Sequence, residues 1–330
     1  MAQRTQRRVS ISWIRQSTRG QSVARELHAK HYCVTSLGRS RRRNAPLRWL
    51  LNAAKTWRIL RAEKPDVIFV ENPPIFAGLV AWLYCRHRRA VYVLDTHSGA
   101  FTYTRWAAFS WLHKFIARRA LLSLVHNDPM RKKVSAWGAS ALTVEGDPFD
   151  LPSEGVYELE TGFNVAVVSS FDKDEPIEVV LDAARELPDV KFYITGDSRL
   201  CPSEVRAHAP DNAVFTGFLA LSQYAALLRG SDVVVCLTTH DNTMQSGAYE
   251  AVALRRPVIT SNWGVLRSVF RRGAVCINIS SDELVSAIGQ VRGDHARFVR
   301  EIESLRTELL GQWQQTLGRL VETLDEVGCS

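Results

Sequence analysis

The sequence has no cysteine pair with the spacing of a metal site. Its six cysteines are scattered, and none belongs to a CxxC or CxxH pair. This pattern argues against both a zinc site and a disulfide framework. Cysteines of this kind are typical of a protein kept in a reducing compartment.

Long hydrophobic runs are also missing. The longest apolar stretch, Ile75 to Cys85, is shorter than the about 20 residues that a membrane-spanning helix needs. Near the start of the chain, Arg15 and Gln16 interrupt an apolar run before it reaches the length of a signal-peptide core. We therefore expect a cytoplasmic protein.

No RRM, zinc-finger or helix-turn-helix signature accompanies the net charge of +8, so nucleic acid is not an expected partner. The basic clusters all lie before residue 150, and a basic half attracts anionic lipid or phosphorylated substrates. Peripheral association with the inner face of a membrane is one expectation, and ordinary solvated charge is the alternative. The clusters are Arg39 with Arg41 to Arg43, Arg86 with Arg88 and Arg89, Arg118 with Arg119, and Arg131 to Lys133.

The length of 330 residues exceeds what one hydrophobic core usually supports, which predicts two domains. Strands alternate with helices over residues 1–150 and again over 162–281, and a Pro-, Gly- and Glu-rich linker separates the two series. The fold class is therefore α/β, with two doubly wound Rossmann-like domains facing a cleft and ligands at the carboxyl ends of the strands. Residues 282–330 have a helical pattern.

The most informative segment follows the strand that ends at Leu237. A polar loop leads into a helix that opens near Ser246 and Gly247. The free amides and positive dipole end of a helix N-terminus can bind a diphosphate, and Gly247 would allow it to approach closely. Glu250 lies one turn later and could accept hydrogen bonds from ribose hydroxyls, although an ordinary surface acid is the alternative.

This segment resembles the retaining glycosyltransferases of family 4 (group 1) and their GT-B relatives. Their signature is E-x7-E followed by E-A-x-A-x-G-x-P-V-I-x-S, and Tyr249 to Ser261 matches its second half. Thr216 to Phe218 and Ser231 with Asp232 match what precedes it. The resemblance implies the GT-B fold, a nucleoside diphosphate sugar as donor, and C-terminal helices that cross back to the first domain.

The chain departs from the family pattern in the donor domain. Asn242 stands where the family has the first glutamate of its element, which touches the transferred sugar. Where the family carries a phosphate-binding arginine and lysine, only Lys173 is present, near Ser170. These departures keep the fold but weaken a retaining mechanism, and they raise the alternative of a non-catalytic sugar-nucleotide-binding subunit.

No convincing metal motif appears. Asp172 and Asp174 have the spacing of a DxD metal–diphosphate site, but they precede Pro176, where we expect them to cap the next helix. The family fold usually works without a metal. We therefore expect no metal and no cofactor besides the donor itself.

In the first half, PDVIFVENPP followed by VLDTHSGAFT is similar to the acceptor domain of mannosyltransferases that act on lipid-linked chitobiose. The similarity implies a saccharide or polyprenyl-linked acceptor. Sugar transfer needs a base for the acceptor hydroxyl, and either Asp95 or His97 could serve, unless both only satisfy loop backbone groups. Arg19, Gly20 and Asn72 lie on neighbouring loops and are the expected acceptor-binding residues, Gly20 through a tight turn or a close ligand approach.

The segment from Arg105 to Leu122 predicts one helix with aromatic and basic side chains, which suits either a membrane interface or a half-buried helix. The leading interpretation of the whole sequence is a hexosyltransferase for glycan or polysaccharide synthesis. A sugar-nucleotide epimerase of the same fold and the non-catalytic subunit are the alternatives.

Overall fold

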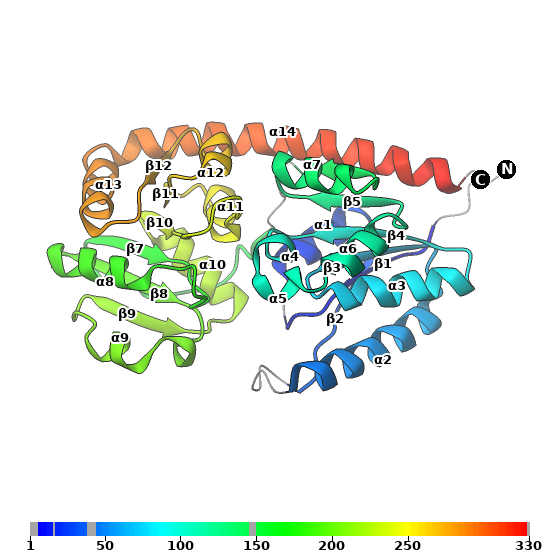
Figure 1. Ribbon diagram of the computed structural model, residues 1–330. Coiled ribbons are helices and arrows are strands. Elements are labelled where there is room, and N and C mark those ends of the chain that lie inside the picture. Colours follow the sequence, from blue (N-terminus) through cyan, green and yellow to red (C-terminus); the bar gives the residue numbers. More distant parts are fainter. Residues whose placement is uncertain (1–5, 16, 38–43, 145–149, 329–330) are drawn as a thin grey trace. The chain divides into compact units, whose positions relative to one another are not determined.

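The computed structural model describes residues 6–15, 17–37, 44–144 and 150–328 (Figure 1). The chain divides into two compact units. Unit 1 comprises Met1–Pro148 with Gly311–Ser330, and unit 2 comprises Phe149–Leu310. Each unit contains one six-stranded parallel sheet with helices on both faces.

Unit 1 alternates strands and helices along the chain. Its elements are β1 (Arg8–Ser12), α1 (Thr18–Glu26), β2 (Lys30–Cys33), α2 (Ala45–Glu63), β3 (Val67–Asn72), α3 (Ile75–His87), β4 (Val91–Thr96), α4 (Gly99–Thr102), α5 (Thr104–Ala107), α6 (Ser110–Ala117), β5 (Leu122–Val125), α7 (Asp128–Ala136) and β6 (Ala141–Thr143).

The sheet of unit 1 has the order β2-β1-β3-β4-β5-β6. Alternate residues of β3 point to opposite faces, as in any strand. Ile68 and Val70 pack under α2, α3 and α6, whereas Val67 and Phe69 pack under α1 and the end of the C-terminal helix. The strand order reverses between β1 and β3, which makes the carboxyl ends of these strands the topological switch point.

Unit 2 repeats the same plan. Its elements are β7 (Phe163–Val167), α8 (Ile177–Glu186), β8 (Val190–Thr195), η2 (Ser198–Leu200), α9 (Ser203–Ala207), β9 (Ala213–Gly217), α10 (Leu221–Gly230), β10 (Val233–Cys236), α11 (Ser246–Ala253), β11 (Val258–Ser261), α12 (Gly264–Val269), β12 (Ala274–Ile277), α13 (Ser281–Gly293) and, up to Leu310, the first part of α14 (His295–Gly328).

The sheet of unit 2 has the order β12-β11-β10-β7-β8-β9, so its switch point lies between β7 and β10. Val165 and Val167 of β7 pack under α8 and α13 on one face, and Ala166 packs under α10 and α11 on the other. The loops after β7 and β10 therefore define the place where this sheet can hold a ligand.

The two doubly wound α/β domains predicted from the sequence are confirmed. From Gly311 onward α14 belongs to unit 1, where Trp313 and Leu320 join its core, as the family resemblance implied. The single helix expected from Arg105 is wrong, because the chain turns between α5 and α6 and brings the rings of Trp106 and Phe109 against Trp49. Among the described residues, no helix combines the length and apolar character needed to cross a bilayer.

Candidate active site

The first candidate site lies at the switch point of unit 2, where α11 begins. Gln245 precedes this helix without capping it through its side chain, and no acidic residue lies in the first turn. Ser246 is exposed at the helix start. The amides and the positive dipole end of α11 are therefore free of a competing carboxylate, as anion binding requires.

Gly247 has a different role from the one expected. A Cβ atom on Gly247 would lie 2.7 Å from Val168 Cγ1 and 2.9 Å from Cys236 Sγ. The missing side chain thus lets α11 pack against the ends of β7 and β10. Close helix packing explains this glycine, and close ligand approach is not needed to explain it.

Glu250 is a buried carboxylate, only 8% exposed, so it is not an ordinary surface acid. The hydroxyl of Tyr224 in α10 donates a hydrogen bond of 2.5 Å to Glu250 Oε2. Burial raises the pKa of Glu250 to about 7, although the bond from Tyr224 acts in the opposite direction. Near neutral pH the protonated and the ionised forms of this carboxyl group are therefore both populated.

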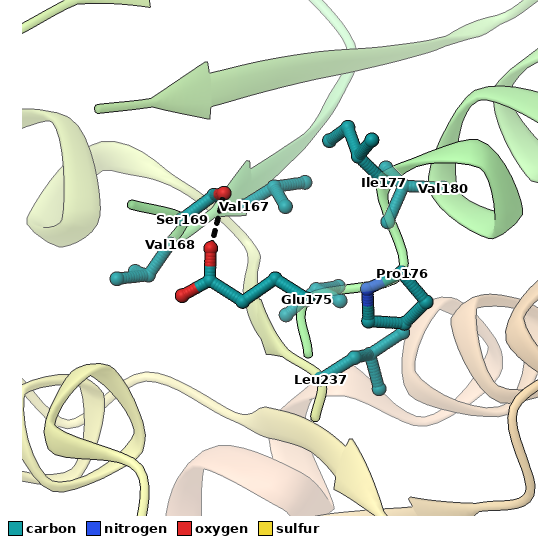
Figure 2. A pocket seen from close by; sticks show the side chains of 9 residues that line it. Val167, Val168, Ser169, Glu175, Pro176, Ile177, Val180 and Leu237 are labelled. Carbon is teal, nitrogen blue, oxygen red and sulfur yellow. Dashed lines mark hydrogen bonds between the residues drawn. The ribbon is translucent and has the colours of Figure 1, made fainter. Parts of the chain in front are cut away.

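The loop after β7 closes on a carboxylate of its own. Glu175 Oε2 accepts hydrogen bonds of 2.7 Å from both Ser169 Oγ and the Ser170 amide, and Oε1 accepts one of 3.0 Å from Ser170 Oγ. Figure 2 shows the bond to Ser169 at the edge of a small pocket that Val168, Ile177 and Leu237 also line. Burial raises the pKa of Glu175.

This arrangement corrects the expectation that Asp172 and Asp174 cap the following helix. The residue before α8 is Pro176, and no side chain caps that helix. Asp174 instead accepts a hydrogen bond of 2.9 Å from Thr238 Oγ1, and its carbonyl accepts one of 2.7 Å from the Thr239 amide. The buried Asp174 thereby ties the loop after β7 to the loop after β10.

The loop after β10 carries the polar groups nearest in sequence to α11. Asn242 has a φ of 60°, a left-handed conformation that asparagine adopts more readily than glutamate. This backbone explains why an amide suits the position where the family has an acid. Thr243 Oγ1 and His240 Nδ1 are buried without a hydrogen-bond partner, whereas Lys173 is exposed.

The second candidate site lies at the carboxyl ends of the strands of unit 1. Arg19 of α1 forms a buried ion pair with Asp95 of β4. The other oxygen of Asp95 lies 3.6 Å from Nε2 of His126, which follows β5. Burial alone would raise the pKa of Asp95, but the Arg19 guanidinium and the nearby His126 ring outweigh burial and hold it below its usual range.

His97 is the accessible member of this cluster, with a side chain that is 34% exposed. Its amide donates a hydrogen bond of 2.8 Å to the carbonyl of Asn72, and its ring lies 4.7 Å from the ring of His126. Its Nε2 atom is itself buried, lies 4.0 Å from Glu71 Oε1 and has no hydrogen-bond partner, so the exposed part of the side chain is elsewhere on the ring. Desolvation and the neighbouring His126 lower the pKa of His97, so its imidazole is neutral at pH 7.

The expected acceptor-binding residues are buried beside this cluster. Arg19 is 4% exposed and Asn72 is 0% exposed, so neither presents an open side chain, and their contact with an acceptor stays a prediction. Gly20 lies inside α1, where a Cβ atom would come within 2.4 Å of Glu71 Oε1. Gly20 therefore serves helix packing, and the expected tight turn is wrong.

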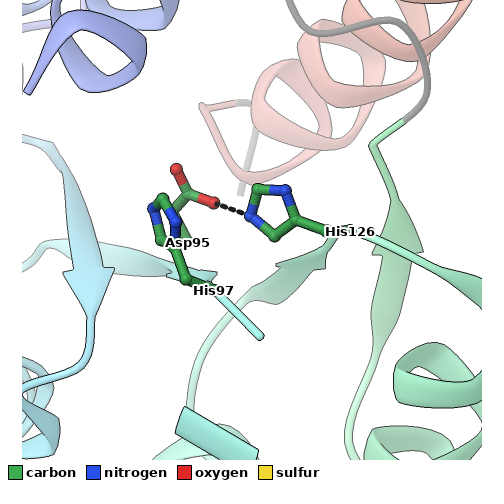
Figure 3. A group of neighbouring side chains, drawn as sticks. All are labelled: Asp95, His97 and His126. Carbon is green, nitrogen blue, oxygen red and sulfur yellow. Dashed lines mark ion pairs between the residues drawn. The ribbon is translucent and has the colours of Figure 1, made fainter. Parts of the chain in front are cut away.

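Figure 3 shows that Asp95, His97 and His126 point toward one another, and one ligand atom from each lies within 4.8 Å of the others. Such a set can bind a metal ion in principle. Here Arg19 already places a positive charge on Asp95, which opposes a second cation at the same carboxylate. The expectation that no metal is required stays a prediction.

The sequence interpretation missed several residues of both sites. Tyr224, Asp174 and Thr238 belong to the unit 2 site through side-chain hydrogen bonds, and Glu71 and His126 belong to the unit 1 site. His126 could have been found, because it directly follows β5 while Asp95 lies one residue before the end of β4, and neighbouring parallel strands end at the same edge of a sheet. Tyr224 carried no such signal. Arg39 to Arg43 lie outside the described residues.

Comparison with protein families matches both halves of the chain. Residues 162–294 match the family model described as glycosyl transferases group 1, and residues 5–145 match the model described as glycosyl transferase 4-like domain. No curated protein matches the sequence.

Solved structures resemble the chain over nearly its whole length. Sucrose-phosphate synthase from Thermosynechococcus elongatus has a TM-score of 0.70 at 15% identity, covering 97% of this chain and 99% of that one. HepE from Anabaena in complex with UDP and glucose has a TM-score of 0.69 at 14% identity, covering 97% and 100%. MnaA from S. aureus with UDP has a TM-score of 0.62 at 13% identity, covering 90% and 91%. At these identities the likeness is one of fold.

Proposed function

We propose that this chain, which belongs to the group 1 glycosyltransferases and has the GT-B fold, transfers a hexose from a nucleoside diphosphate sugar to a saccharide or polyprenyl-linked acceptor. Unit 2 would bind the donor and unit 1 the acceptor. Two of the similar structures contain UDP, which supports a nucleotide donor here. Transfer of this kind serves glycan or polysaccharide synthesis on the cytoplasmic side of a membrane.

The buried Glu250 carboxylate is the observation that carries this proposal. A buried acid costs stability unless it is paired, and Glu250 has one neutral hydrogen-bond donor in Tyr224. Its remaining acceptor capacity suits the two hydroxyls of a ribose. The amides of Ser246 and Gly247 would then bind the diphosphate, with Thr243 and Asn242 toward the sugar and Ser170 and Lys173 on the facing loop.

His97 is the base that we propose for the acceptor. The neutral imidazole of His97 would take the proton of the acceptor hydroxyl as the new oxygen–carbon bond forms and the bond from the anomeric carbon to the diphosphate breaks. Asp95 is less suited to this role, because Arg19 and His126 keep it ionised and occupied. The departing diphosphate would be stabilised by the N-terminus of α11 and not by a metal ion.

Donor binding can be tested by thermal shift with UDP, GDP, ADP and their sugars. We expect one nucleotide family to stabilise the protein, by about 2.7 kcal/mol at 100 times its dissociation constant. Glu250→Gln should weaken that nucleotide by 10- to 100-fold, roughly the value of a hydrogen bond to a charged group. Glu204→Gln, on an exposed helix of unit 2, is the matched control. If no nucleotide stabilises the wild type, the donor site is wrong.

The base can be tested once a donor is found. His97→Gln should lower the transfer rate by about 10²- to 10⁴-fold while nucleotide binding is unchanged, because general-base catalysis contributes about that much. EDTA should leave the rate unaltered. A chain that binds nucleotide but transfers no sugar to any acceptor would instead support the non-catalytic subunit, which the exposed Lys173 and the occupied loop at Glu175 also favour.

A further inference from the structure

An apolar face with a basic end is left uncovered along α2 and α3 of unit 1. Leu47, Leu50 and Leu51 are 53%, 69% and 38% exposed, which is unusual for three leucines of one helix. Their spacing continues through Ala54 to Arg58 and Arg61, so all of them follow one stripe of the helix.

The stripe ends in a groove between the two helices. Figure 1 shows α2 beside α3, and the groove between them is lined by Ala54, Trp57, Arg58 and Arg61 of α2 and by Leu83 of α3. Leu83 is itself 40% exposed. The ring of Trp57, which lines the groove, packs edge-on against Tyr84 with centroids 6.0 Å apart. We call the surface from Leu47 to this groove the α2–α3 face.

The charged side chains of these two helices are basic with one exception. Within Ala45–Glu63 and Ile75–His87, which are fully described, Glu63 is the one acidic residue. Its carboxylate is already bound by Lys30 at 2.8 Å and by Tyr32 at 2.5 Å. The basic residues of the same two helices are Arg48, Lys55, Arg58, Arg61 and Arg86.

We propose that the α2–α3 face docks unit 1 onto an anionic lipid bilayer. The leucines would enter the boundary between headgroups and acyl chains, as the apolar side of an interfacial helix does. Arg58 and Arg61 have long side chains whose charged ends can reach lipid phosphates while their stems lie on apolar surface. A protein partner would match leucines equally well, but it would not by itself explain why free carboxylates are excluded from both helices.

The inference goes beyond sugar transfer, because docking needs neither a donor nor an acceptor. Flotation of the purified protein with phosphatidylcholine vesicles, with and without phosphatidylglycerol, therefore tests it separately from nucleotide binding. We expect flotation with the anionic vesicles, weak flotation with the neutral ones, and a loss of binding as salt rises.

Two variants test the face itself. Leu50→Glu should reduce binding by about tenfold or more, since burying one leucine is worth at least that much. Arg58→Glu with Arg61→Glu should reduce it by more than about fivefold for each residue changed, because each change removes a positive charge and adds a negative one. Leu200→Glu and Arg300→Glu are matched controls, because both residues are exposed and lie in unit 2, and both should float like the wild type.

Thermal unfolding by circular dichroism should show that every variant is folded, as expected for exposed positions. Equal flotation of wild type and Leu50→Glu would overturn the proposal. So would a wild type that fails to bind anionic vesicles, or one that self-associates in sedimentation through the α2–α3 face without binding lipid.

Discussion

The two units solve the same topological problem with opposite electrostatics. Each has a parallel sheet whose order reverses once, and each collects polar side chains at the carboxyl ends of the strands beside that reversal. In unit 1 the central carboxylate, Asp95, forms an ion pair with Arg19 and stays ionised. In unit 2 the central carboxylate, Glu250, meets only the neutral hydroxyl of Tyr224, and its pKa rises to about 7. The topology fixes where a ligand can bind, and the partner of the carboxylate decides its charge.

Among the changes that test this difference, the largest effect is expected from removing Arg19, the cation that pairs with Asp95 in unit 1. Arg19→Met should lower the free energy of unfolding by about 3–5 kcal/mol, because it leaves a buried Asp95 carboxylate without its main partner. Urea unfolding followed by tryptophan fluorescence reports mainly on unit 1, since Trp263 is the single tryptophan of unit 2.

The control for this experiment is the double variant Arg19→Met with Asp95→Asn, which removes the stranded charge and should recover a large part of the loss. If the double variant were no more stable than Arg19→Met alone, packing of the arginine stem, and not its charge, would be what stabilises unit 1.

The stability of the protein should depend on pH in opposite directions through the two carboxylates. The pKa of Glu250 rises on folding from 4.5 to about 7, so its contribution to stability is complete below pH 4.5 and is lost as the pH rises through 7. That loss is on the order of 3 kcal/mol. The pKa of Asp95 falls on folding, so its contribution is complete above pH 3.8 and is lost only in stronger acid.

Glu250→Gln isolates the unit 2 effect. The variant should gain stability relative to the wild type as the pH is raised from 5 to 8, measured by urea unfolding at each pH. A difference between the two proteins that does not change over this range would show that Glu250 does not titrate there.

Sequence reasoning selected the central carboxylates of both candidate sites but not the residues that bind them in the fold. Helix N-termini, strand ends and the motif from Tyr249 to Ser261 each lie along one stretch of chain, so spacing alone places Glu250 one turn into α11 and Asp95 near the end of β4. The bond from Tyr224 to Glu250 joins residues 26 apart, and the pair of Arg19 with Asp95 joins residues 76 apart. Such contacts depend on how elements pack, which periodicity does not encode. The same limit explains why the packing contacts of Gly20 and Gly247 were not foreseen, while their roles toward ligands stay predictions.

Substitutions at these two glycines should have the smallest effects, and they test the packing of the two units directly. Each glycine lies where a helix packs closely at a switch point. Gly247→Ala would push a methyl group against the stiff, β-branched Val168 and should cost about 1–3 kcal/mol. In Gly20→Ala the methyl group meets Glu71 Oε1 at 2.4 Å, Ser17 Oγ at 2.7 Å and His31 Cε1 at 2.9 Å. All three atoms are ends of side chains that can rotate away, although Glu71 would lose its 2.5 Å bond from Ser17. Gly20→Ala should therefore cost less, toward the lower end of that range.

Gly289→Ala is the matched control, because it lies exposed within α13 and a Cβ atom there meets nothing within 4 Å. It should stabilise the protein by up to about 1 kcal/mol through helix propensity. If Gly247→Ala were as harmless as this control yet abolished the nucleotide-induced thermal shift, the methyl group would have to be blocking a ligand. The missing side chain of Gly247 would then serve close ligand approach, and the packing of α11 against Val168 and Cys236 would be secondary.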